Sequence, residues 1–525
     1  MNQPLTTTTL TPARQAEFDR LQSKLVPLWK QIGRSDPGGP IQGDNTVVVV
    51  PSLTADIEFP ATKLQAYEQR FLFLLFLLRQ PRLRMIYVTS LPVRPSIVNY
   101  YLDTLPGVIP SSARKRLDFV SLEDGSPTPL TQKLLDRPHM IVHIRSLIPD
   151  VDRAHVVPFN TTDLERELAL QMGVPMYAAD PAFYAFGTKS GARRVFAEVG
   201  VPYPLGQEDL FSEAALIEAV AQMRAEKPTL KKVIVKLNEG VAGMGNATVD
   251  LRPLPPPGAS DEAAALRQAL QDMIFEVPEV TYASYMSRLQ EGGAIVEELI
   301  AGRAFTSPSA QLRITPLGEV EMLSTHDQIL GGPTGQSFLG SRFPAQGEYA
   351  WPIMAAAQKI GRRLADEGVL GRFAVDFVVV QDEEDRWQPY AIEINLRKGG
   401  TTAPFLTLQY LTDGRYDAEA SVFTTVRGDV KCYVSSDHVE SPAYRVFTPD
   451  RLFDIVSQRR LHYDHASQTG IILHMLSDVG GSGQFGATAI ADSHQAADAL
   501  YRRFLDILEE EVQFCQLPVT IQAKG

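Results

Sequence analysis

The sequence predicts a mixed α/β protein built from several domains. An uninterrupted apolar run at residues 46–50 precedes a helical pattern at 61–79 and a second apolar run at 83–89. That order of strand, helix and strand is typical of a parallel sheet covered by helices. Two apolar strands at 374–380 and 390–394 flank a charged turn, which predicts a β-hairpin. A chain of 525 residues also exceeds what a single hydrophobic core holds.

Composition excludes several function classes. Hydrophobic residues make up 44% of the sequence and charged residues 21%, as in ordinary soluble globular proteins. A net charge of −12 argues against general nucleic-acid binding, which needs a basic surface. Cys432 and Cys515 are too few and too far apart for a disulfide framework, which suits a reducing cytoplasm. We see no secretion signal, and the apolar run at 71–78 is too short to span a bilayer. We therefore expect a cytoplasmic protein without nucleic-acid or membrane partners.

Other elements follow from local patterns along the chain. We expect one helix at 12–32, after a threonine-rich start, and strands at 140–144 and 154–157 that extend the first sheet. Ser212 is a plausible N-cap because its hydroxyl precedes an amphipathic run. Pro352 suits the first turn of a helix. The later helices are expected at 213–226, 262–275, 352–368 and 494–513.

The hairpin at 374–394 carries the strongest chemical signal. Asp376 on the first strand, with Glu393 and Asn395 on the second, can face one side together because strand side chains alternate. Carboxylate and amide oxygens are hard ligands, which Mg²⁺ accepts when phosphate oxygens complete its octahedron. Arg397, in phase with Glu393, adds a fixed cation. The pattern predicts a polyphosphate site; the simpler alternative is an edge hairpin with solvated charges.

A glycine-rich loop lies upstream of that hairpin. Lys236 lies near the end of an apolar strand, and Gly240, Gly243 and Gly245 follow it. Glycines let backbone N–H groups approach a phosphate, and the lysine supplies a point charge to it. The loop is neither a P-loop nor a dinucleotide fingerprint, because no Gly-Lys-Ser/Thr follows and the next stretch reads as a strand. A plain turn is the alternative interpretation.

An apolar strand at 293–302 is interrupted by two acids, Glu297 and Glu298. A carboxylate there can accept hydrogen bonds from a ribose or an adenine amino group, while the strand backbone pairs with the adenine edge. Taken alone, acids at the exposed end of a strand are the better explanation of this motif. The order of lysine, glycine loop, acidic strand and Asp/Glu-x-Asn pair favours a nucleotide site.

These residues resemble the ATP-grasp superfamily of carboxylate–amine ligases. The segment Phe186-Gly-Thr-Lys189-Ser-Gly is similar to the helix that carries the first ATP-binding lysine. Arg397 falls where these enzymes keep an arginine near the acyl-phosphate. Asp376 departs from the family, which often has glutamate there. The nucleotide positions that the resemblance implies are Lys189, Lys236, Gly240, Gly243, Gly245, Glu297, Glu298 and Leu299, and the metal positions are Asp376, Glu393 and Asn395.

A narrower resemblance, to the pheganomycin-type peptide ligases, covers almost the whole chain. It implies ATP-dependent joining of an amino-acid-like carboxylate to an amine or peptide N-terminus, with Mg²⁺ or Mn²⁺ and release of ADP and phosphate. Ala403 departs from the histidine typical of many relatives, so no role of that histidine transfers. The matching motifs include Tyr67-Glu-Gln-Arg70, Asn99-Tyr-Tyr-Leu, Gly187-Thr-Lys-Ser-Gly-Ala-Arg193 and Glu393-Ile-Asn-Leu-Arg-Lys-Gly-Gly-Thr-Thr402.

The resemblance implies a domain order. We expect an N-terminal extension at 1–44, a pre-ATP-grasp α/β domain at 45–175, the ATP-grasp domain at 176–412 and a small α+β domain at 413–525. General frequency favours a homodimer. The functional alternatives are a nucleotide-binding regulatory protein that has lost turnover, and a phosphotransferase or thioester-forming ligase on the same fold.

Several other polar residues have two interpretations. Arginine grips a carboxylate through two N–H donors, so Arg303, Arg313 and Arg342 are candidate substrate clamps, although a surface arginine is the simpler explanation for each. Asp327 and Gln328 lie between the acidic strand at 293–302 and the hairpin at 374–394. They belong either to a segment next to the nucleotide or to a turn. The roles of these five residues stay open at this point.

Overall fold

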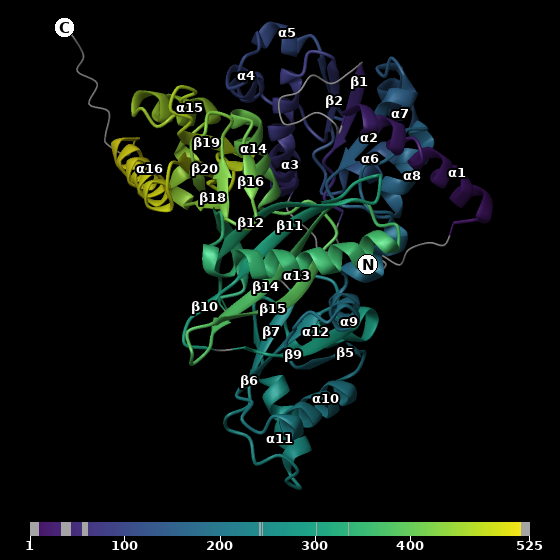
Figure 1. The fold of residues 1–525 in the computed structure, drawn as a ribbon, viewed down its shortest axis with the longest axis vertical. Coiled ribbons are helices and arrows are strands. Elements are labelled where there is room, and N and C mark those ends of the chain that lie inside the picture. Colours follow the sequence, from purple (N-terminus) through teal and green to yellow (C-terminus); the bar gives the residue numbers. More distant parts are fainter. Residues whose placement is uncertain are drawn as a thin grey trace, which may run out of the picture.

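The computed structural model describes residues 10–32, 44–54, 61–240, 243, 245–300, 302–333 and 335–515. Figure 1 shows a helix-covered parallel sheet and the C-terminal elements at the top, a larger sheet in the middle and a smaller lobe at the bottom. The mixed α/β class predicted from the sequence is confirmed. Within the described ranges, we find no helix that is both long and apolar enough to cross a membrane.

The first sheet is parallel, with the strand order β3-β2-β1-β4. Its central strand β1 pairs on both sides, with Val48 opposite Ile86 of β2 and Val156 of β4. Strands of a parallel sheet are covered on both faces, which is why the sequence marks β1 and β2 as continuous apolar runs. The strands are β1 (Asn45–Val50), β2 (Leu83–Thr89), β3 (Leu117–Ser121) and β4 (Ala154–Pro158).

Two predictions for this region are wrong in detail. Residues 140–144, predicted as a strand, lie in helix α7 (Pro138–Ser146), which opens on a proline and buries Ile141 and Ile144 one turn apart. The single helix predicted at 12–32 divides into two. The helices around this sheet are α1 (Pro12–Gln22), α2 (Leu25–Ile32), α3 (Ala61–Arg70), η1 (Phe71–Arg79), α4 (Pro95–Asp103), α5 (Pro110–Arg114), α6 (Leu130–Leu135), α7, η2 (Val151–Arg153) and α8 (Asp163–Met172).

The small lobe is a five-stranded sheet in the order β5-β9-β6-β7-β8. Helix α10 begins after Ser212, whose side chain accepts a hydrogen bond from the Ala215 N–H, so the predicted cap is confirmed. The strands are β5 (Gly206–Leu210), β6 (Lys232–Leu237), β7 (Asn246–Asp250), β8 (Ile274–Phe275) and β9 (Ala294–Glu298). The helices are η3 (Pro181–Gly187), α9 (Lys189–Val199), α10 (Glu213–Glu226), α11 (Glu262–Gln271) and α12 (Tyr282–Gly292).

The central sheet carries the predicted hairpin as β14 paired with β15. Helix α13 (Gly347–Asp366) packs against this sheet through Ile353 and Ile360. It begins five residues before Pro352, so the predicted start at that proline is wrong. The proline is tolerated near the N-terminus because only the Glu348 carbonyl loses a helical donor. The strands are β10 (Phe305–Thr306), β11 (Pro308–Ile314), β12 (Val320–Gly331), β13 (Ser337–Phe343), β14 (Gly371–Gln381) and β15 (Trp387–Asn395).

C-terminal strands extend the same sheet, because β18 pairs with β13 and then with β20. The sheet therefore continues across the predicted boundary near residue 413, and the domain limits stay a prediction. The strands are β16 (Arg415–Asp417), β17 (Val422–Thr424), β18 (Cys432–Glu440), β19 (Gly470–His474) and β20 (Gln484–Ala491). The helices are α14 (Thr402–Thr412), η4 (Pro442–Val446), α15 (Pro449–Gln458), η5 (Leu476–Asp478) and α16 (His494–Cys515).

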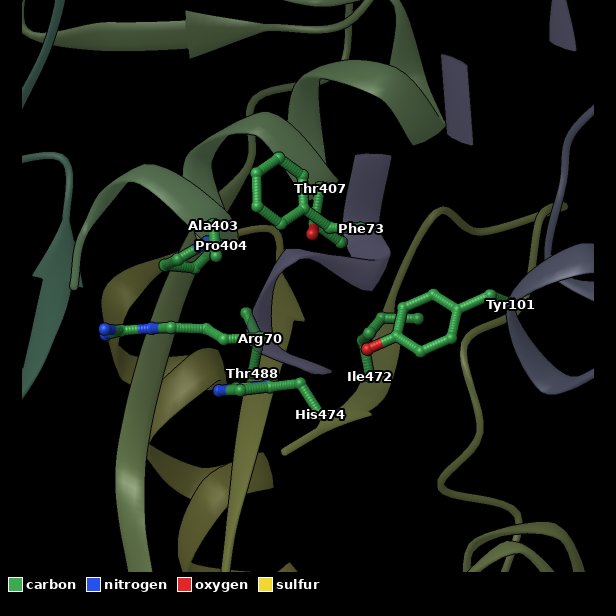
Figure 2. A pocket seen from close by; sticks show the side chains of 9 residues that line it. All are labelled: Arg70, Phe73, Tyr101, Ala403, Pro404, Thr407, Ile472, His474 and Thr488. Atoms are coloured by element: carbon green, nitrogen blue, oxygen red, sulfur yellow. The ribbon is translucent and has the colours of Figure 1, made fainter. Parts of the chain in front are cut away.

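A buried ion pair joins the first and last parts of the chain. Arg70 at the end of α3 pairs with Asp437 of β18, and the His474 ring nitrogen lies 2.9 Å from the other oxygen of that carboxylate. Figure 2 shows Arg70 and His474 beside the start of α14, where they line a cavity with room for about one water molecule. Burial raises the pKa of Asp437, but Arg70 and His474 outweigh that effect and lower it to about 2.

We expect the substitution Arg70→Met to lower the free energy of unfolding by about 3–5 kcal/mol, because it leaves the buried Asp437 carboxylate without its cation. Urea unfolding at pH 7 measures this. Because the pKa of Asp437 is lowered in the folded protein, its ion pair contributes fully to stability above pH 3.8, the value for the unfolded chain. The contribution is lost as the pH falls towards 2.

The matched control is Arg84→Met, whose ion pair with Asp118 is about one third exposed and should contribute less than about 1 kcal/mol. An equal decrease in the free energy of unfolding in Arg70→Met and Arg84→Met would contradict the importance of the buried ion pair.

Candidate active site

The pairing of β14 with β15 brings the predicted metal ligands onto one face. Asp376 lies opposite Glu393, and Ala374 lies opposite Asn395. The Asn395 amide donates to Asp376 Oδ2 at 3.0 Å. The opposite face of β14 is packed against α13, so these polar side chains lie on the other face, where Lys189 of α9 meets Glu393.

The neighbouring carboxyl groups of Asp376 and Glu393 have pKa values shifted in opposite directions. Burial, followed by the Glu393 charge, raises the pKa of Asp376 to about 6. Burial alone would also raise the pKa of Glu393, but Lys189 and Arg397 outweigh it, and that pKa is lowered. Lys189 Nζ lies 2.5 Å from Glu393 Oε1. A divalent cation fits this donor set, because two carboxylates and an amide oxygen offer hard ligands while phosphate oxygens complete the sphere.

Lys189 reaches the hairpin from the first turn of α9, in the segment that the sequence assigned to it. Thr188 caps this helix by accepting from the Gly191 N–H at 3.0 Å. Gly191 is required there, because a Cβ on it would lie 1.8 Å from the Ala185 carbonyl oxygen. The helix therefore begins at Lys189, directly after its cap, and the lysine reaches Glu393 of β15 from the first turn.

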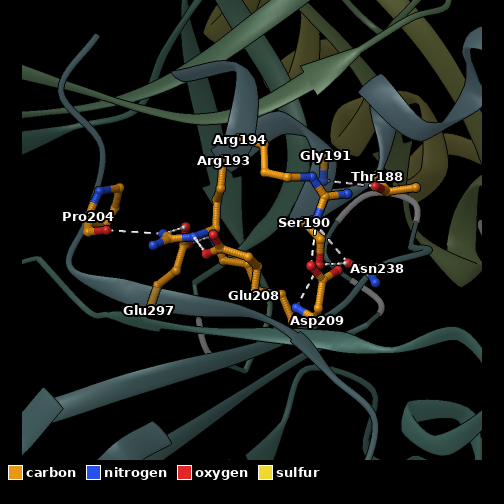
Figure 3. A network of polar contacts seen from close by, with 11 residues as sticks. Thr188, Ser190, Gly191, Arg193, Arg194, Pro204, Glu208, Asp209, Asn238 and Glu297 are labelled. Carbon is orange, nitrogen blue, oxygen red and sulfur yellow. Dashed lines mark hydrogen bonds and ion pairs between the residues drawn. The ribbon is translucent and has the colours of Figure 1, made fainter. Parts of the chain in front are cut away.

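Asn238 links α9 to the glycine loop. Its side-chain oxygen accepts from the Ser190 N–H at 3.0 Å and from the Ser190 hydroxyl at 2.8 Å. Its amide donates to the Gly292 carbonyl at 3.0 Å. Figure 3 shows Asn238 between the start of α9 and the loop. The sequence pattern alone gives no sign of this role, because the partners of Asn238 lie on distant segments.

Lys236 forms a buried triad with Glu297 and Arg193. Lys236 Nζ donates to Glu297 Oε2 at 2.7 Å, and Arg193 Nη1 donates to Oε1 at 2.8 Å. Glu297 is 1% exposed, so two cations balance one carboxylate inside the lobe. Arg193 also donates to the Pro204 carbonyl and to Glu208, as Figure 3 shows. Its role was missed, although it stands one helical turn after Lys189.

The glycine loop sits against the turn between β12 and β13. Gly243 has a φ of +86°, and a Cβ on it would lie 2.8 Å from the Gln336 carbonyl oxygen, so only glycine suits this position. The Gly245 carbonyl accepts from the Tyr285 hydroxyl at 3.0 Å, which anchors the end of the loop. Gly240 is also described, whereas the neighbouring residues 241, 242 and 244 lie outside the described part of the chain.

The predicted adenine-binding segment at Glu298 and Leu299 is held by an ion pair and by backbone hydrogen bonds. Glu298 pairs with Lys227 at 2.5 Å, and its N–H donates to the Leu205 carbonyl. The Leu299 N–H donates to the Lys232 carbonyl at 3.1 Å. This segment of β9 thus lies between β5 and β6 and is hydrogen-bonded on both sides. The nucleotide roles of Glu297, Glu298 and Leu299 stay predictions.

The cations that follow β15 diverge. The Arg397 charge lowers the pKa of both Asp376 and Glu393, so it acts on the metal face. Lys398 is buried and donates instead to the Pro158 carbonyl at 2.8 Å, at the end of β4. Arg397 therefore acts on the proposed metal ligands, whereas Lys398 joins the segment after β15 to strand β4 of the parallel sheet.

The other candidates are distributed over the molecule. Arg303 forms an exposed pair with Asp385, and Arg342 pairs with Asp498, so neither lies in the cleft. Asp327 and Gln328 lie within β12 rather than in a turn. Asp327 accepts from the Tyr349 hydroxyl at 2.8 Å. Arg313 is different, because it faces the junction with the parallel sheet.

Comparison with known proteins agrees with this geometry. A family model described as "IQCH-like, ATP-grasp" matches residues 181–268 and 260–419, and a "PGM1 C-terminal domain" model matches 451–504. The L-propargylglycine–L-glutamate ligase of Streptantibioticus cattleyicolor is 29% identical over 81% of this chain and 86% of that protein. The IQ motif-containing protein H of Danio rerio is 23% identical over 83% of this chain, which spans 45% of that protein.

Solved structures with the same fold include an ADP complex of N5-carboxyaminoimidazole ribonucleotide synthetase, with a TM-score of 0.51. Biotin carboxylase from Campylobacter jejuni has a TM-score of 0.53. Each is 12% identical to this chain and aligns with 90% of it, covering 98% and 95% of the two solved chains respectively.

The fold is that of ATP-grasp enzymes, and an ATP-grasp family model matches residues 181–268 and 260–419. The recognition of an ATP-grasp protein from the Lys189, glycine-loop and hairpin motifs is thereby confirmed. Within the superfamily it resembles the pheganomycin-type ligases, and the prediction of a ligase class is confirmed in that general form.

We expect Asn238→Ala to weaken nucleotide binding about tenfold, because losing the bonds that hold α9 against the glycine loop costs about 1.4 kcal/mol. Isothermal titration with a non-hydrolysable ATP analogue measures the change. Gln222→Ala, which removes an exposed bond to Gln207, is the matched control. Unchanged affinity in Asn238→Ala would contradict the role of this link.

Proposed function

We propose that the protein is an ATP-dependent carboxylate–amine ligase that forms an amide bond through an acyl-phosphate. The observation that carries this proposal is the meeting of Lys189 with Glu393, directly beside Asp376 and under the charge of Arg397. Two carboxylates held among fixed cations on one sheet face are suited to a metal-bound polyphosphate.

Nucleotide binding is assigned to the small lobe and the central sheet together. Lys189 and Lys236 hold the phosphates, the glycine loop covers them with backbone N–H groups, and the strand edge at Glu297–Leu299 holds the adenine. Asp376, Glu393 and Asn395 would hold Mg²⁺, which supplies charge neutralisation at the transferring phosphoryl group. Phosphoryl transfer needs mainly positioning and electrostatics, so the protein does little covalent work.

The substrate carboxylate oxygen attacks the γ-phosphorus, the bond to ADP breaks, and an acyl-phosphate results. Arg397 stabilises the negative charge of this anhydride. An amine nitrogen then attacks the acyl carbon, phosphate leaves, and the amine loses a proton. One well-placed charge contributes about 3 kcal/mol, or roughly 10² in rate. The glycine loop, packed against the β12–β13 turn, excludes water that would hydrolyse the intermediate.

The relatives support small-molecule substrates of amino-acid type. The name of the Streptantibioticus cattleyicolor relative states that it joins L-propargylglycine and L-glutamate, which are both amino acids. We assign the same broad class of donor and acceptor to this chain. A carboxylate–amine ligase requires both partners before ADP release becomes continuous.

We expect Lys236→Ala and Glu393→Ala each to reduce ATP-dependent ligation at least tenfold, because each removes a charge from the phosphate or metal site. Release of ADP and phosphate is measured with Mg·ATP across mixtures of amino acids and short peptides, with mass spectrometry of the product. A product lighter than acid plus amine by one water identifies ligation.

The controls lie on the same two elements. Lys232→Ala removes an exposed lysine from β6, and Glu384→Ala removes an exposed acid from the β14–β15 turn. Both should retain wild-type turnover. Wild-type turnover in Lys236→Ala or Glu393→Ala, with circular dichroism showing an intact fold, would refute the site. A stable phosphorylated product would indicate a phosphotransferase, and dependence on a thiol a thioester-forming ligase.

A further inference from the structure

A second polar row lies on the same face of the central sheet as the proposed metal site. Arg313 of β11 lies directly opposite Arg372 of β14. Ser309 of β11 lies opposite Asp376 in the same register. Because strand side chains alternate, Arg372 and Asp376 point to one face, separated by about 13 Å along the strand. The two arginines thus stand at the end of the cleft that meets the parallel sheet.

Like charges directly opposite one another destabilise a sheet, so this pair requires an explanation. Glu321 of β12 pairs directly with Arg313, whose Nε donates to its carboxylate at 2.6 Å, and it acts on Arg372 only through its charge. Arg372 Nη1 is buried and has no hydrogen-bond partner among the residues that the structure describes. Lys398 adds a third cation, since its charge and that of Arg372 act on each other. Arg313 and Arg372 therefore share the single carboxylate of Glu321, and Lys398 lies near enough for its charge to act on Arg372.

The electrostatics agree with this arrangement. Burial, followed by the Arg313 charge, lowers the pKa of Arg372 to about 10, so its guanidinium remains charged at neutral pH. Burial, followed by the Arg372 charge, lowers the pKa of Lys398 to about 7. The remaining titratable groups that act on Arg372 are Glu321 and two phenols, Tyr177 and Tyr410.

Aromatic rings fix the positions of these cations. The Arg313 guanidinium lies 4.7 Å from the centre of the Trp29 ring, which in turn stacks on Tyr177 at 5.5 Å. Lys398 is held by the Pro158 carbonyl. The cluster is therefore rigid before any ligand arrives, which lowers the entropic cost of binding an anion.

We propose that Arg372, assisted by Arg313 and Lys398, binds the non-reacting carboxylate of an acidic amino-acid substrate. This inference rests on the proposed function, because the reacting carboxylate is then the one beside Arg397. A guanidinium offers two parallel N–H donors to a carboxylate, and the bound anion supplies the acceptor that Arg372 Nη1 lacks.

A purely structural role explains the cluster poorly. An unsatisfied buried N–H group costs about 1–3 kcal/mol, and an apolar side chain at Arg372 would avoid that cost. The alternation of β14 also places Arg372 on the cleft face, whereas Phe373 and Val375 fill the core against α13. The arginine is thus directed to the side of the sheet where a substrate is expected.

The test compares acids with their uncharged amides. The probes are L-glutamate, L-aspartate and the peptide γ-glutamylglycine, against L-glutamine and L-asparagine, with Mg·ATP and the amine panel. In the full-length wild-type protein we expect kcat/KM to favour an acid over its amide at least tenfold. Arg372→Met should raise KM for that acid at least tenfold and abolish the preference, while KM for ATP stays unchanged.

Two further variants separate binding from structure. Arg372→Lys should restore part of the preference, because it returns the charge without the paired donors. Arg303→Met, which removes an exposed arginine paired with Asp385, should behave as wild type. A wild type without preference for acids, or an Arg372→Met variant that keeps the preference, would overturn the inference.

Failure of the proposed ligase activity is recognised separately. If no mixture releases ADP, equilibrium dialysis of radiolabelled L-glutamate and L-aspartate against the wild type, with a non-hydrolysable ATP analogue present, replaces the kinetic readout. Binding that weakens at least tenfold in Arg372→Met supports the carboxylate site without catalysis. Absence of binding of both acids to the wild type would overturn the inference as well.

Discussion

The register between β14 and β15 is the constraint on which the rest of the site depends. With Asp376 opposite Glu393 and Ala374 opposite Asn395, three oxygen ligands face the cleft. The pairing shifts after Asp376, so that Phe377 lies opposite Ala391 and Ile392 is the extra residue. A slip of one residue would turn every side chain of one strand to the other face. The bulge thus confines the correct register to the end of the hairpin where the chemistry is expected.

The same register organises charges beyond the hairpin. β14 also pairs with β11, which aligns Arg313 with Arg372 and sets the cation cluster at a fixed distance from Asp376. The chain as a whole carries a net charge of −12, yet its cleft collects lysines and arginines. Acids inside the lobe make this possible, because Glu297 pairs with both Lys236 and Arg193 and so offsets part of the cost of burying their charges. Local pairing, rather than net charge, determines the potential that an anionic substrate meets.

Much of the site could be predicted because its signals are local. The hairpin, the Lys189 helix and the glycine loop are each defined by patterns a few residues long. The helix at Pro138–Ser146 was mistaken for a strand because a short apolar run fits both periods, and only its proline start distinguishes it. Arg372 could not be recognised, since its significance comes from Arg313 on another strand, about sixty residues earlier. Tertiary register is the information that the sequence patterns lacked.

Substrate recognition draws on parts of the chain outside the nucleotide motifs. The loop after Arg397 is held by Gln311, which donates to Thr401, and by Arg70, whose guanidinium lies against Gly400. A Cβ on Gly400 would also meet the Phe338 ring at 2.5 Å, so the backbone there is enclosed. Ala403 follows in the buried first turn of α14.

The loop after Arg397 is thus held by the central sheet together with Arg70, which is itself fixed by Asp437 of β18. Nucleotide chemistry needs only the two lobes that carry Lys189, Lys236 and the β14–β15 hairpin. A change of donor or acceptor therefore requires substitutions at the junction of three regions, where Arg70 and Arg372 lie, and leaves the phosphate site untouched.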